Sequence, residues 1–300
     1  MQTVENADIM GKKVADQLVE TICRAGIRHI YAVTGDSLNE VNDAVRRAGT
    51  VRWVHVRHEE SGAFAAAAES ELNGIACCAG SSGPGHVHLI NGLYDAHRSN
   101  CPVLAIASTC PSDQFGTGYF QETDPIRLFD DCSGYNQMAV TPAQFARMLP
   151  AALQHAIHRR EVAVVGLPGD VAASPCAESP GASGPLPSHG IYRPLDGELR
   201  QLAEMIGSAE RITVFCGIGA REAHDEVVRL AAMLKAPVAY TFKAKMEVQY
   251  DNPYEIGMTG LLGLPSAYGA MHESDLLLLL GTDFPYDCFL PSECRIAQVD

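Results

Sequence analysis

The chain has 300 residues, 47% of them hydrophobic, so it can bury a large core and is long enough for two domains. Its formal net charge of −14 disfavours nucleic acid as a partner, and no Lys/Arg run offers a basic patch. Ten scattered cysteines without a CxxC pair are typical of reduced, cytosolic thiols. The first residues do not form a signal peptide, and no apolar run is long enough to span a membrane. Composition therefore predicts a cytoplasmic protein.

Strand and helix patterns alternate along the first half of the chain. The expected elements are a helix over 14–25, strands over 27–33 and 51–56, a helix over 59–72, a strand over 75–79, a loop over 80–85, a helix over 86–98 and a strand over 102–107. After a less regular stretch, a helix is expected over 142–158 and a buried strand over 162–167. This alternation predicts an α/β fold with a parallel sheet covered by helices on both faces.

Residues 174–190 are dense in Pro, Gly and Ser, which is typical of a linker. A second α/β pattern follows, with helices over 196–206 and 221–234 and strands over 212–216, 237–240, 275–280 and 295–299. We therefore expect a first domain over 8–173, a linker over 174–194 and a Rossmann-like second domain over 195–300. Since domains seldom end on a buried strand, we expect the second domain to be truncated. A natural end on an edge strand is the alternative.

Two features of the first domain suggest a ligand site. Glu59 opens the small-residue helix, where an acidic residue also simply complements the helix dipole. The loop Gly80–Gly85, GSSGPG, joins a strand to a helix, so its amides could bind an anion or let a cofactor ring approach. The loop matches neither a P-loop nor GxGxxG. Alone, it predicts no particular ligand.

Other motifs are weaker or absent. Gly217-Ile218-Gly219 begins like a dinucleotide fingerprint, but Arg221 and Glu222 break the GxGxxG pattern. The histidines form no HExxH pair, so a metal site built from protein ligands alone is not expected. No GxSxG elbow is present, and the cysteines have no evident base partner. These patterns disfavour hydrolase and zinc-enzyme functions.

Several segments, taken in order, carry a family resemblance. They are VTGDSLN (33–39), RHEE (57–60), AGSSGPG (79–85), HLINGLYDAHR (88–98), PVLAIA (102–107), GYFQETDP (118–125) and LPGDV (167–171). They resemble the pyrimidine-binding domain of the thiamine-diphosphate-dependent pyruvate:quinone oxidoreductase and pyruvate oxidase family. GMTGLLG (257–263) and GTDFPY (281–286) resemble that family's central FAD domain. The ordered agreement of many segments is more specific than any one of them.

The resemblance implies roles for individual residues. Glu59 would hydrogen-bond the aminopyrimidine ring of thiamine diphosphate, and Phe120 and Gln121 would line the reacting thiazolium and the flavin edge, so these three are the expected catalytic residues. The residues expected to contact a cofactor are Glu59, Gly83, Pro84 and Gly85 for thiamine diphosphate, and Thr259, Gly260, Leu261, Leu262, Thr282, Asp283, Phe284, Pro285, Tyr286 and Asp300 for FAD. Ordinary turns and core packing are the alternative explanation for the FAD set.

The sequence departs from the family in two places. Relatives often carry Cys where this chain has Ser82, a change that leaves the backbone of the loop intact. No GDG motif followed by Asn is present in residues 1–300, so the Mg2+ and diphosphate site is expected in a further domain outside them. Within residues 1–300 no metal ligands are expected.

The implied activity is decarboxylation of pyruvate, or another 2-keto acid, with electrons passing to FAD and on to a quinone. The family forms its sites between subunits, so a homo-oligomer is expected. The full-length protein would be cytoplasmic with peripheral association at the inner membrane. Two alternatives remain: an acetolactate synthase-like carboligase, and a truncated binding protein without catalysis.

Overall fold

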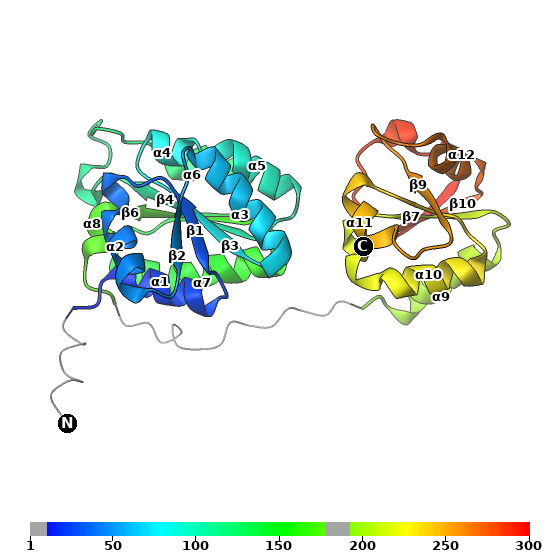
Figure 1. Ribbon diagram of the computed structural model, residues 1–300, viewed down its shortest axis with the longest axis horizontal. Helices are drawn as coiled ribbons and strands as arrows, with labels where there is room; N and C mark the ends of the chain where they lie inside the picture. Colours follow the sequence, from blue (N-terminus) through cyan, green and yellow to red (C-terminus); the bar gives the residue numbers. More distant parts are fainter. Residues whose placement is uncertain (1–10, 178–192) are drawn as a thin grey trace, which may run out of the picture. The chain divides into compact units, whose positions relative to one another are not determined.

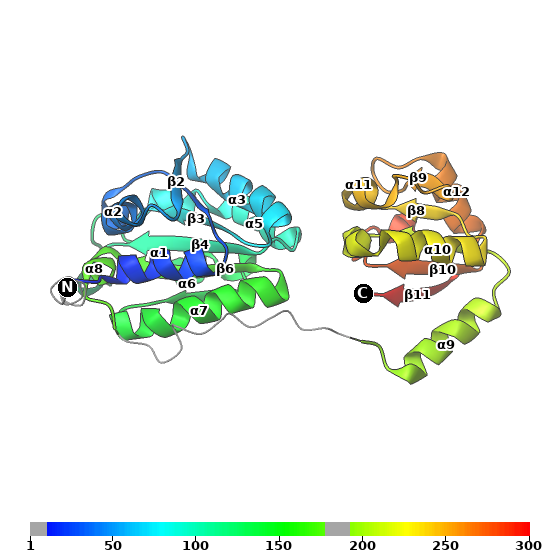
Figure 2. The same cartoon turned by 60° about the horizontal axis from the view of Figure 1, so that its bottom comes forward.

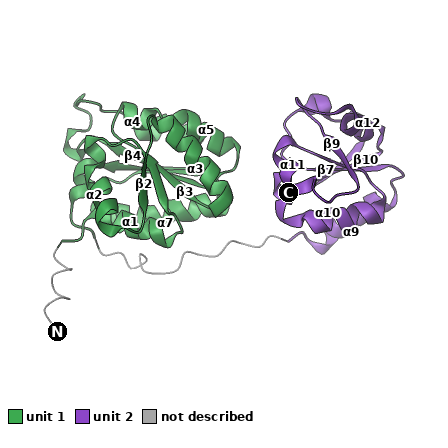
Figure 3. Cartoon of the chain, in the orientation of Figure 1, with its two compact units in different colours: residues 1–191 green, residues 192–300 purple. Residues whose placement is uncertain are grey.

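The computed structural model describes residues 11–177 and 193–300. The chain divides into two compact units, residues 1–191 and residues 192–300, coloured separately in Figure 3. Residues 8–10 of the expected first domain and 178–192 of the expected linker lie outside the described residues. Each unit has hydrophobic clusters of its own, so each is described by itself.

The first unit is built on a six-stranded parallel sheet with the strand order β2-β1-β3-β4-β6-β5 (Figure 1). Its strands are β1 (His29–Ala32), β2 (Arg52–His55), β3 (Ala76–Gly80), β4 (Val103–Thr109), β5 (Tyr135–Met138) and β6 (Val162–Pro168). A bridge between Lys13 and Pro175 brings the two ends of this unit together.

Helices cover both faces of this sheet. The longer ones are α1 (Val14–Arg24), α2 (Asn39–Ala48), α3 (Glu59–Asn73), α5 (Ile90–Arg98) and α7 (Pro142–Arg159), and the short ones are α4 (Pro84–Val87), α6 (Pro125–Leu128) and α8 (Gly169–Ala173). Figure 2 shows α1 and α7 on one side of the strands and α3 and α5 on the other.

The two faces are filled by alternate residues of each strand, because successive side chains of a strand point to opposite faces. Cys77 belongs to the core shared with α1, α2 and α7, whereas its neighbour Cys78 belongs to the core under α3 and α5. Every residue of β3, β4 and β6 is buried. This explains why these strands have continuous apolar sequences without polar alternation.

The strand order fixes where a ligand would bind. From β1 the chain moves outward to β2 and then returns to β3 on the other side of β1. Such a switch point leaves a crevice beyond the carboxyl ends of the two strands, which is where open α/β sheets bind ligands. The segments that meet there are residues 33–38 after β1 and the loop Gly80–Gly85 after β3.

The second unit has a five-stranded parallel sheet with the order β11-β10-β7-β8-β9. Its strands are β7 (Ile212–Cys216), β8 (Val238–Tyr240), β9 (Glu255–Met258), β10 (Leu276–Leu280) and β11 (Arg295–Val299), and its helices are α9 (Asp196–Gly207), α10 (His224–Leu234), α11 (Lys245–Val248) and α12 (Pro265–Glu273). One core lies under α10, and a second contains Ala267 and Met271 of α12. The switch point of this sheet lies between β7 and β10.

The predicted fold class, α/β with parallel sheets, is confirmed. Sequence patterns missed β5, β9 and α12; β5 is an edge strand without a buried run, and β9 has an irregular register against β8. The helix expected over 86–98 is divided into α4 and α5. The last strand, β11, lies at the edge of the sheet, and its residues are exposed or half-buried.

Candidate functional site

Glu59 lies at the start of α3 with only 7% of its surface exposed. His58 caps the helix, since its Nδ1 accepts the N–H of Glu60 at 3.3 Å. The Nδ1 of His88 lies 3.0 Å from Oε2 of Glu59 and donates to it. The other oxygen, Oε1, lies beside the Gly80–Gly85 loop, where a Cβ added to Gly85 would lie 3.5 Å away. The carboxylate thus has one oxygen held by the protein and one facing the glycine loop.

The Gly80–Gly85 loop packs too closely for side chains at its glycines. Gly83 has φ = 63°, and a Cβ there would lie 2.8 Å from the Cβ of Gln121. Gln121 itself has φ = 61°, the left-handed region that is costly for a residue with a side chain. Ser82 Oγ donates to Oε1 of Gln121 at 3.3 Å. Gln121 is therefore held in a strained conformation directly against the glycine loop.

Serine side chains join the loops at the carboxyl edge of the first sheet. Ser37 Oγ, from the segment after β1, accepts the N–H of Ser82 at 2.9 Å and lies 3.0 Å from Ser81 Oγ. Ser108 Oγ, at the end of β4, lies 2.8 Å from the Ser37 carbonyl oxygen and 3.0 Å from that of Leu167. The crevice at the switch point is consequently lined by loops that hold one another in place.

The loop that carries Phe120 and Gln121 is braced from both sides. The carboxylate of Glu122 accepts the backbone N–H groups of Gly116, Gly118 and Tyr119, and these hydrogen bonds lower the pKa of Glu122 below its ordinary value. On the other side, the ring of His86 lies between the Ser108 carbonyl and the Thr123 hydroxyl. Phe120, by contrast, is 78% exposed.

The structure brings several of the predicted first-unit residues together. Glu59 lies beside Gly85 and Gln121 lies against Gly83 of the same loop, and Pro84 begins α4 between these two glycines. Phe120 is on the same loop as Gln121, but its ring stands in solvent. Sequence reasoning missed the role of His88 as the partner of Glu59, as well as the serine links. No spacing along the chain relates residues 59 and 88, so no signal in the sequence pairs them; for Ser37 the signal was its position in the turn after β1.

In the second unit, two glycine turns meet at the switch point. Gly219 N–H donates to the Gly281 carbonyl at 2.9 Å, and a Cβ on Gly217 would lie 2.2 Å from that same oxygen. A cavity of about 990 Å³ opens beside these turns, between α9 and the sheet. Asp300, at the end of β11, lines this cavity together with Gly219 and Gly281. Asp300 is one of the residues that the sequence predicts to contact FAD.

The other predicted FAD residues lie on the turns after β9 and β10. Thr259 is buried, and its Oγ1 has no hydrogen-bond partner among the described residues. Phe284 packs edge-on against Phe215 at 5.0 Å and lies beneath Gly260. The remaining members differ in exposure: Thr282 is buried, whereas Leu261, Leu262, Asp283, Pro285 and Tyr286 are exposed. Phe284 supports the turn from the core, while Thr259 offers an unused polar atom.

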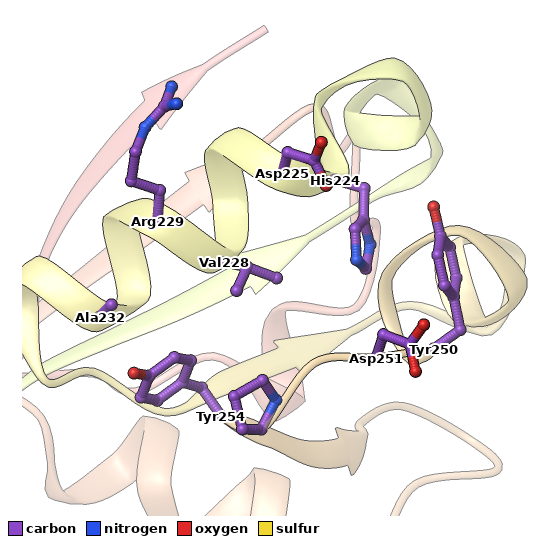
Figure 4. Close-up of a pocket in the computed structure, with 9 residues that line it drawn as sticks. His224, Asp225, Val228, Arg229, Ala232, Tyr250, Asp251 and Tyr254 are labelled. Carbon is purple, nitrogen blue, oxygen red and sulfur yellow. The ribbon is translucent and has the colours of Figure 1, made fainter.

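A second cavity, of about 470 Å³, lies between the start of α10 and the connection from α11 to β9 (Figure 4). The rings of His224 and Tyr250 stack there at 4.0 Å, and the Nδ1 of His224 donates to the Glu247 carbonyl. Asp225 and Asp251 add two carboxylates. No predicted cofactor residue lines this cavity.

Family comparisons match both units. Residues 12–128 match the N-terminal TPP binding domain of thiamine pyrophosphate enzymes, and residues 199–300 match the central domain of the same enzymes. No helix among the described residues is both long and apolar enough to cross a membrane.

Individual relatives agree with the family match. An uncharacterized 42.6 kDa protein in the isoamylase 3′ region of Pseudomonas amyloderamosa is 50% identical over 290 residues, which cover 96% of this chain and 73% of that protein. Pyruvate oxidase of Lactiplantibacillus plantarum is 33% identical over 87% of this chain and 44% of its own length. The chloroplastic acetolactate synthase of Arabidopsis thaliana is 30% identical over 91% of this chain and 42% of its own length.

The chain thus spans less than half of the two named enzymes. Because an N-terminal TPP binding domain that contains Glu59 is followed along the sequence by a central domain, the chain belongs to the thiamine pyrophosphate enzyme family.

Proposed function

We propose that this chain supplies the pyrimidine-binding domain and the flavin-binding central domain of an enzyme that oxidatively decarboxylates pyruvate and passes the electrons to a quinone. The single observation that carries the proposal is the placement of Glu59. Its carboxylate is buried, one oxygen accepts from His88, and the other faces the Gly80–Gly85 loop at the switch point. A helix-dipole role alone requires neither burial nor an oxygen aimed at a crevice.

The residues around Glu59 fit an aminopyrimidine ring. Oε1 can accept a hydrogen bond from a ring nitrogen, and the absence of a side chain at Gly85 leaves its backbone bare beside that oxygen. The Gly80–Gly85 loop is held in place by the hydrogen bonds of Ser82 with Ser37 and Gln121. This limits the reorganisation that ligand binding would cost. Thiamine diphosphate, when bound, supplies the electron sink for decarboxylation. The protein supplies position, polarity and a proton acceptor.

The second unit fits a dinucleotide such as FAD. Its glycine turns lie at the switch point of a parallel sheet, beside the cavity that Asp300 lines. The Thr259 hydroxyl is buried without a hydrogen-bond partner among residues 11–177 and 193–300, and a bound ligand is one explanation for a buried polar atom of this kind. In this proposal the Mg2+ and diphosphate contacts come from outside residues 1–300, supplied by a partner subunit in a homo-oligomer.

The choice of substrate and acceptor rests on sequence similarity. Pyruvate oxidase is 33% identical to this chain, slightly more than acetolactate synthase at 30%. The segments VTGDSLN and GYFQETDP favour the oxidoreductase. In the proposed reaction, pyruvate and water yield acetate and carbon dioxide, while two electrons and two protons reduce the quinone.

The test combines residues 1–300 with the protein segment that supplies the Mg2+ and diphosphate contacts, and measures carbon dioxide release and quinone reduction from pyruvate with thiamine diphosphate, Mg2+ and FAD added. Calorimetry measures thiamine diphosphate binding in parallel. Glu59→Gln should abolish turnover and weaken binding at least tenfold, because the amide is a poorer acceptor. Glu60→Gln is the matched control: it removes a charge from the same helix turn and should change neither. Equal losses in both variants would contradict the proposal and favour a helix-dipole role.

A carboligase is the second candidate, because acetolactate synthase matches 91% of this chain. The two functions differ in product: the carboligase joins two keto acids, whereas the oxidoreductase releases acetate and reduces the acceptor. Product analysis with and without quinone separates them. Acetolactate formed without quinone consumption would replace the proposed function, and binding without any turnover would favour the non-catalytic alternative.

A further inference from the structure

Two imidazoles and a carboxylate converge at the start of α3. The side chains of His58, Glu59 and His88 each offer a ligand atom, and these atoms all lie within 4.8 Å of one another. The rings of His58 and His88 stack with their centroids 4.4 Å apart. Only 7% of the surface of Glu59 is exposed, whereas the side chains of His58 and His88 are 47% and 42% exposed. A buried anion therefore lies under two histidines that solvent can reach.

Ordinary His–carboxylate pairs occur elsewhere in the first unit and provide a comparison. His29 lies 2.7 Å from Glu69, and His155 lies 2.8 Å from Glu161. Neither belongs to a group of three potential ligands, and the Glu59 cluster is the one such group among the described residues. What distinguishes it is the second imidazole.

We propose that His58, Glu59 and His88 form a site for a divalent transition metal such as Zn2+, and that the metal and thiamine diphosphate exclude each other there. Zinc binds imidazole nitrogen and carboxylate oxygen at about 2.0–2.2 Å in a tetrahedron, which places neighbouring ligand atoms roughly 3.3 Å apart. The 3.0 Å between His88 Nδ1 and Glu59 Oε2 is already close to that spacing. Magnesium is disfavoured because it prefers oxygen ligands.

Loading the site requires two small changes. The proton on Nδ1 of His88 moves to Nε2, so that the Nδ1 lone pair can face the metal. The ring of His58 gives up its 3.3 Å hydrogen bond to the Glu60 N–H and turns toward Glu59, which its half-exposed position allows. Water completes the coordination on the exposed side. The metal then binds Oε2 of the carboxylate whose Oε1 faces the proposed cofactor site, and its positive charge makes Oε1 a poorer hydrogen-bond acceptor for the cofactor.

The first measurement is metal binding alone, on untagged chain in a Cys288→Ser background that removes the exposed thiol. Zn2+ affinity is measured by competition with a chromophoric chelator, and Co2+ is added as a spectroscopic probe. We expect one equivalent of metal and visible cobalt absorption of a nitrogen–oxygen site. His58→Gln, His88→Gln and Glu59→Gln should each weaken binding at least tenfold.

His155→Gln is the matched control, because it removes an imidazole from a His–Glu pair that lacks a second histidine. It should leave the affinity unchanged. The proposal is overturned if wild-type chain binds no metal, if His155→Gln weakens binding as much as His88→Gln, or if both cluster histidines are dispensable. Near-UV circular dichroism of each variant, compared with wild type, shows that a loss does not come from misfolding.

The second measurement, which rests on the proposed function, is thiamine diphosphate binding at increasing Zn2+, with the protein segment that supplies the Mg2+ and diphosphate contacts present. The apparent Kd should rise linearly with the concentration of free Zn2+, as competition for one site requires. Unchanged affinity on metal-loaded chain would overturn mutual exclusion. Failure of thiamine diphosphate to bind even without Zn2+ would instead count against the proposed function and leave the histidine-dependent metal site standing.

Discussion

At the scale of single residues, the surroundings of Glu59 and the Gly80–Gly85 loop are a set of polar atoms whose partners come from distant loops. His86 is fully buried, and burial lowers its pKa below the ordinary value of 6.5, opposed by its hydrogen bond to the Ser108 carbonyl. The neutral ring suits its place, since Nδ1–H donates to that carbonyl while Nε2 can accept from the Thr123 hydroxyl. His86 thereby connects the glycine loop to the loop of Gln121.

This pairing predicts a pH effect of known sign. The unfolded chain takes up a proton on His86 near pH 6.5, whereas the folded chain resists it, so stability from this residue is present above that pH and declines as the pH falls toward the folded pKa. His86→Gln should cost about 1–3 kcal/mol at pH 7.5 and reduce the loss of stability between pH 7.5 and 5.5. Urea denaturation measures both, with His55→Gln on exposed β2 as the control. Equal pH slopes for wild type and His86→Gln would contradict the assignment.

Thr259 allows a second residue-scale prediction because its buried hydroxyl lacks a partner. Replacing it by valine keeps the shape and removes the unsatisfied oxygen, so Thr259→Val should be neutral or stabilise the flavin-free chain by about 1 kcal/mol. The same change should weaken FAD binding about tenfold if the hydroxyl serves the flavin. Thermal denaturation and flavin fluorescence titration give the two readouts. Destabilisation without any effect on FAD would assign Thr259 to the fold alone.

At the scale of elements, the buried strands and the long helices could be predicted because their side-chain periods are strong. The apolar runs of β4 and β6 are typical of central strands in a parallel sheet. The start of α3 at Glu59 is indicated by the run of small residues that follows it. The edge strand β5 could not be predicted, because none of the four residues in its sequence, YNQM, is fully buried. The partners of Glu59 were also out of reach, because His88 meets it only when α3 and the α4–α5 connection fold together.

The contact of α3 with α5 depends on one glycine. A Cβ on Gly92 would lie 2.5 Å from the Cβ of Ala63 and 2.9 Å from the Glu60 carbonyl oxygen. Gly92→Ala should therefore destabilise the first unit by about 1–3 kcal/mol and weaken thiamine diphosphate binding, because α3 carries Glu59. Gly269→Ala on α12 is the matched helical control: nothing lies within 4 Å of its Cβ. It should stabilise the second unit by about 0.5–1 kcal/mol, and denaturation curves report both signs.

At the scale of the whole molecule, the two units share the same kind of architecture. Each has a parallel sheet whose strand order reverses between two neighbouring strands, and each gathers its chemistry-bearing loops at that point. Each unit has two hydrophobic clusters of its own, formed by residues 14–172 in the first and by residues 202–297 in the second. Stability should accordingly be divided between the units rather than shared.

This division predicts two calorimetric transitions for the 300-residue chain. Gly92→Ala should lower only the transition of the first unit, by about 2–8 °C, and Gly269→Ala should raise only that of the second. Separate fragments of residues 1–177 and 193–300 should each unfold near the temperature of the corresponding transition, because each contains both of its own cores. A single transition that moves with either substitution would show that the units stabilise each other. Their cofactor sites would then have to be treated as one cooperative structure.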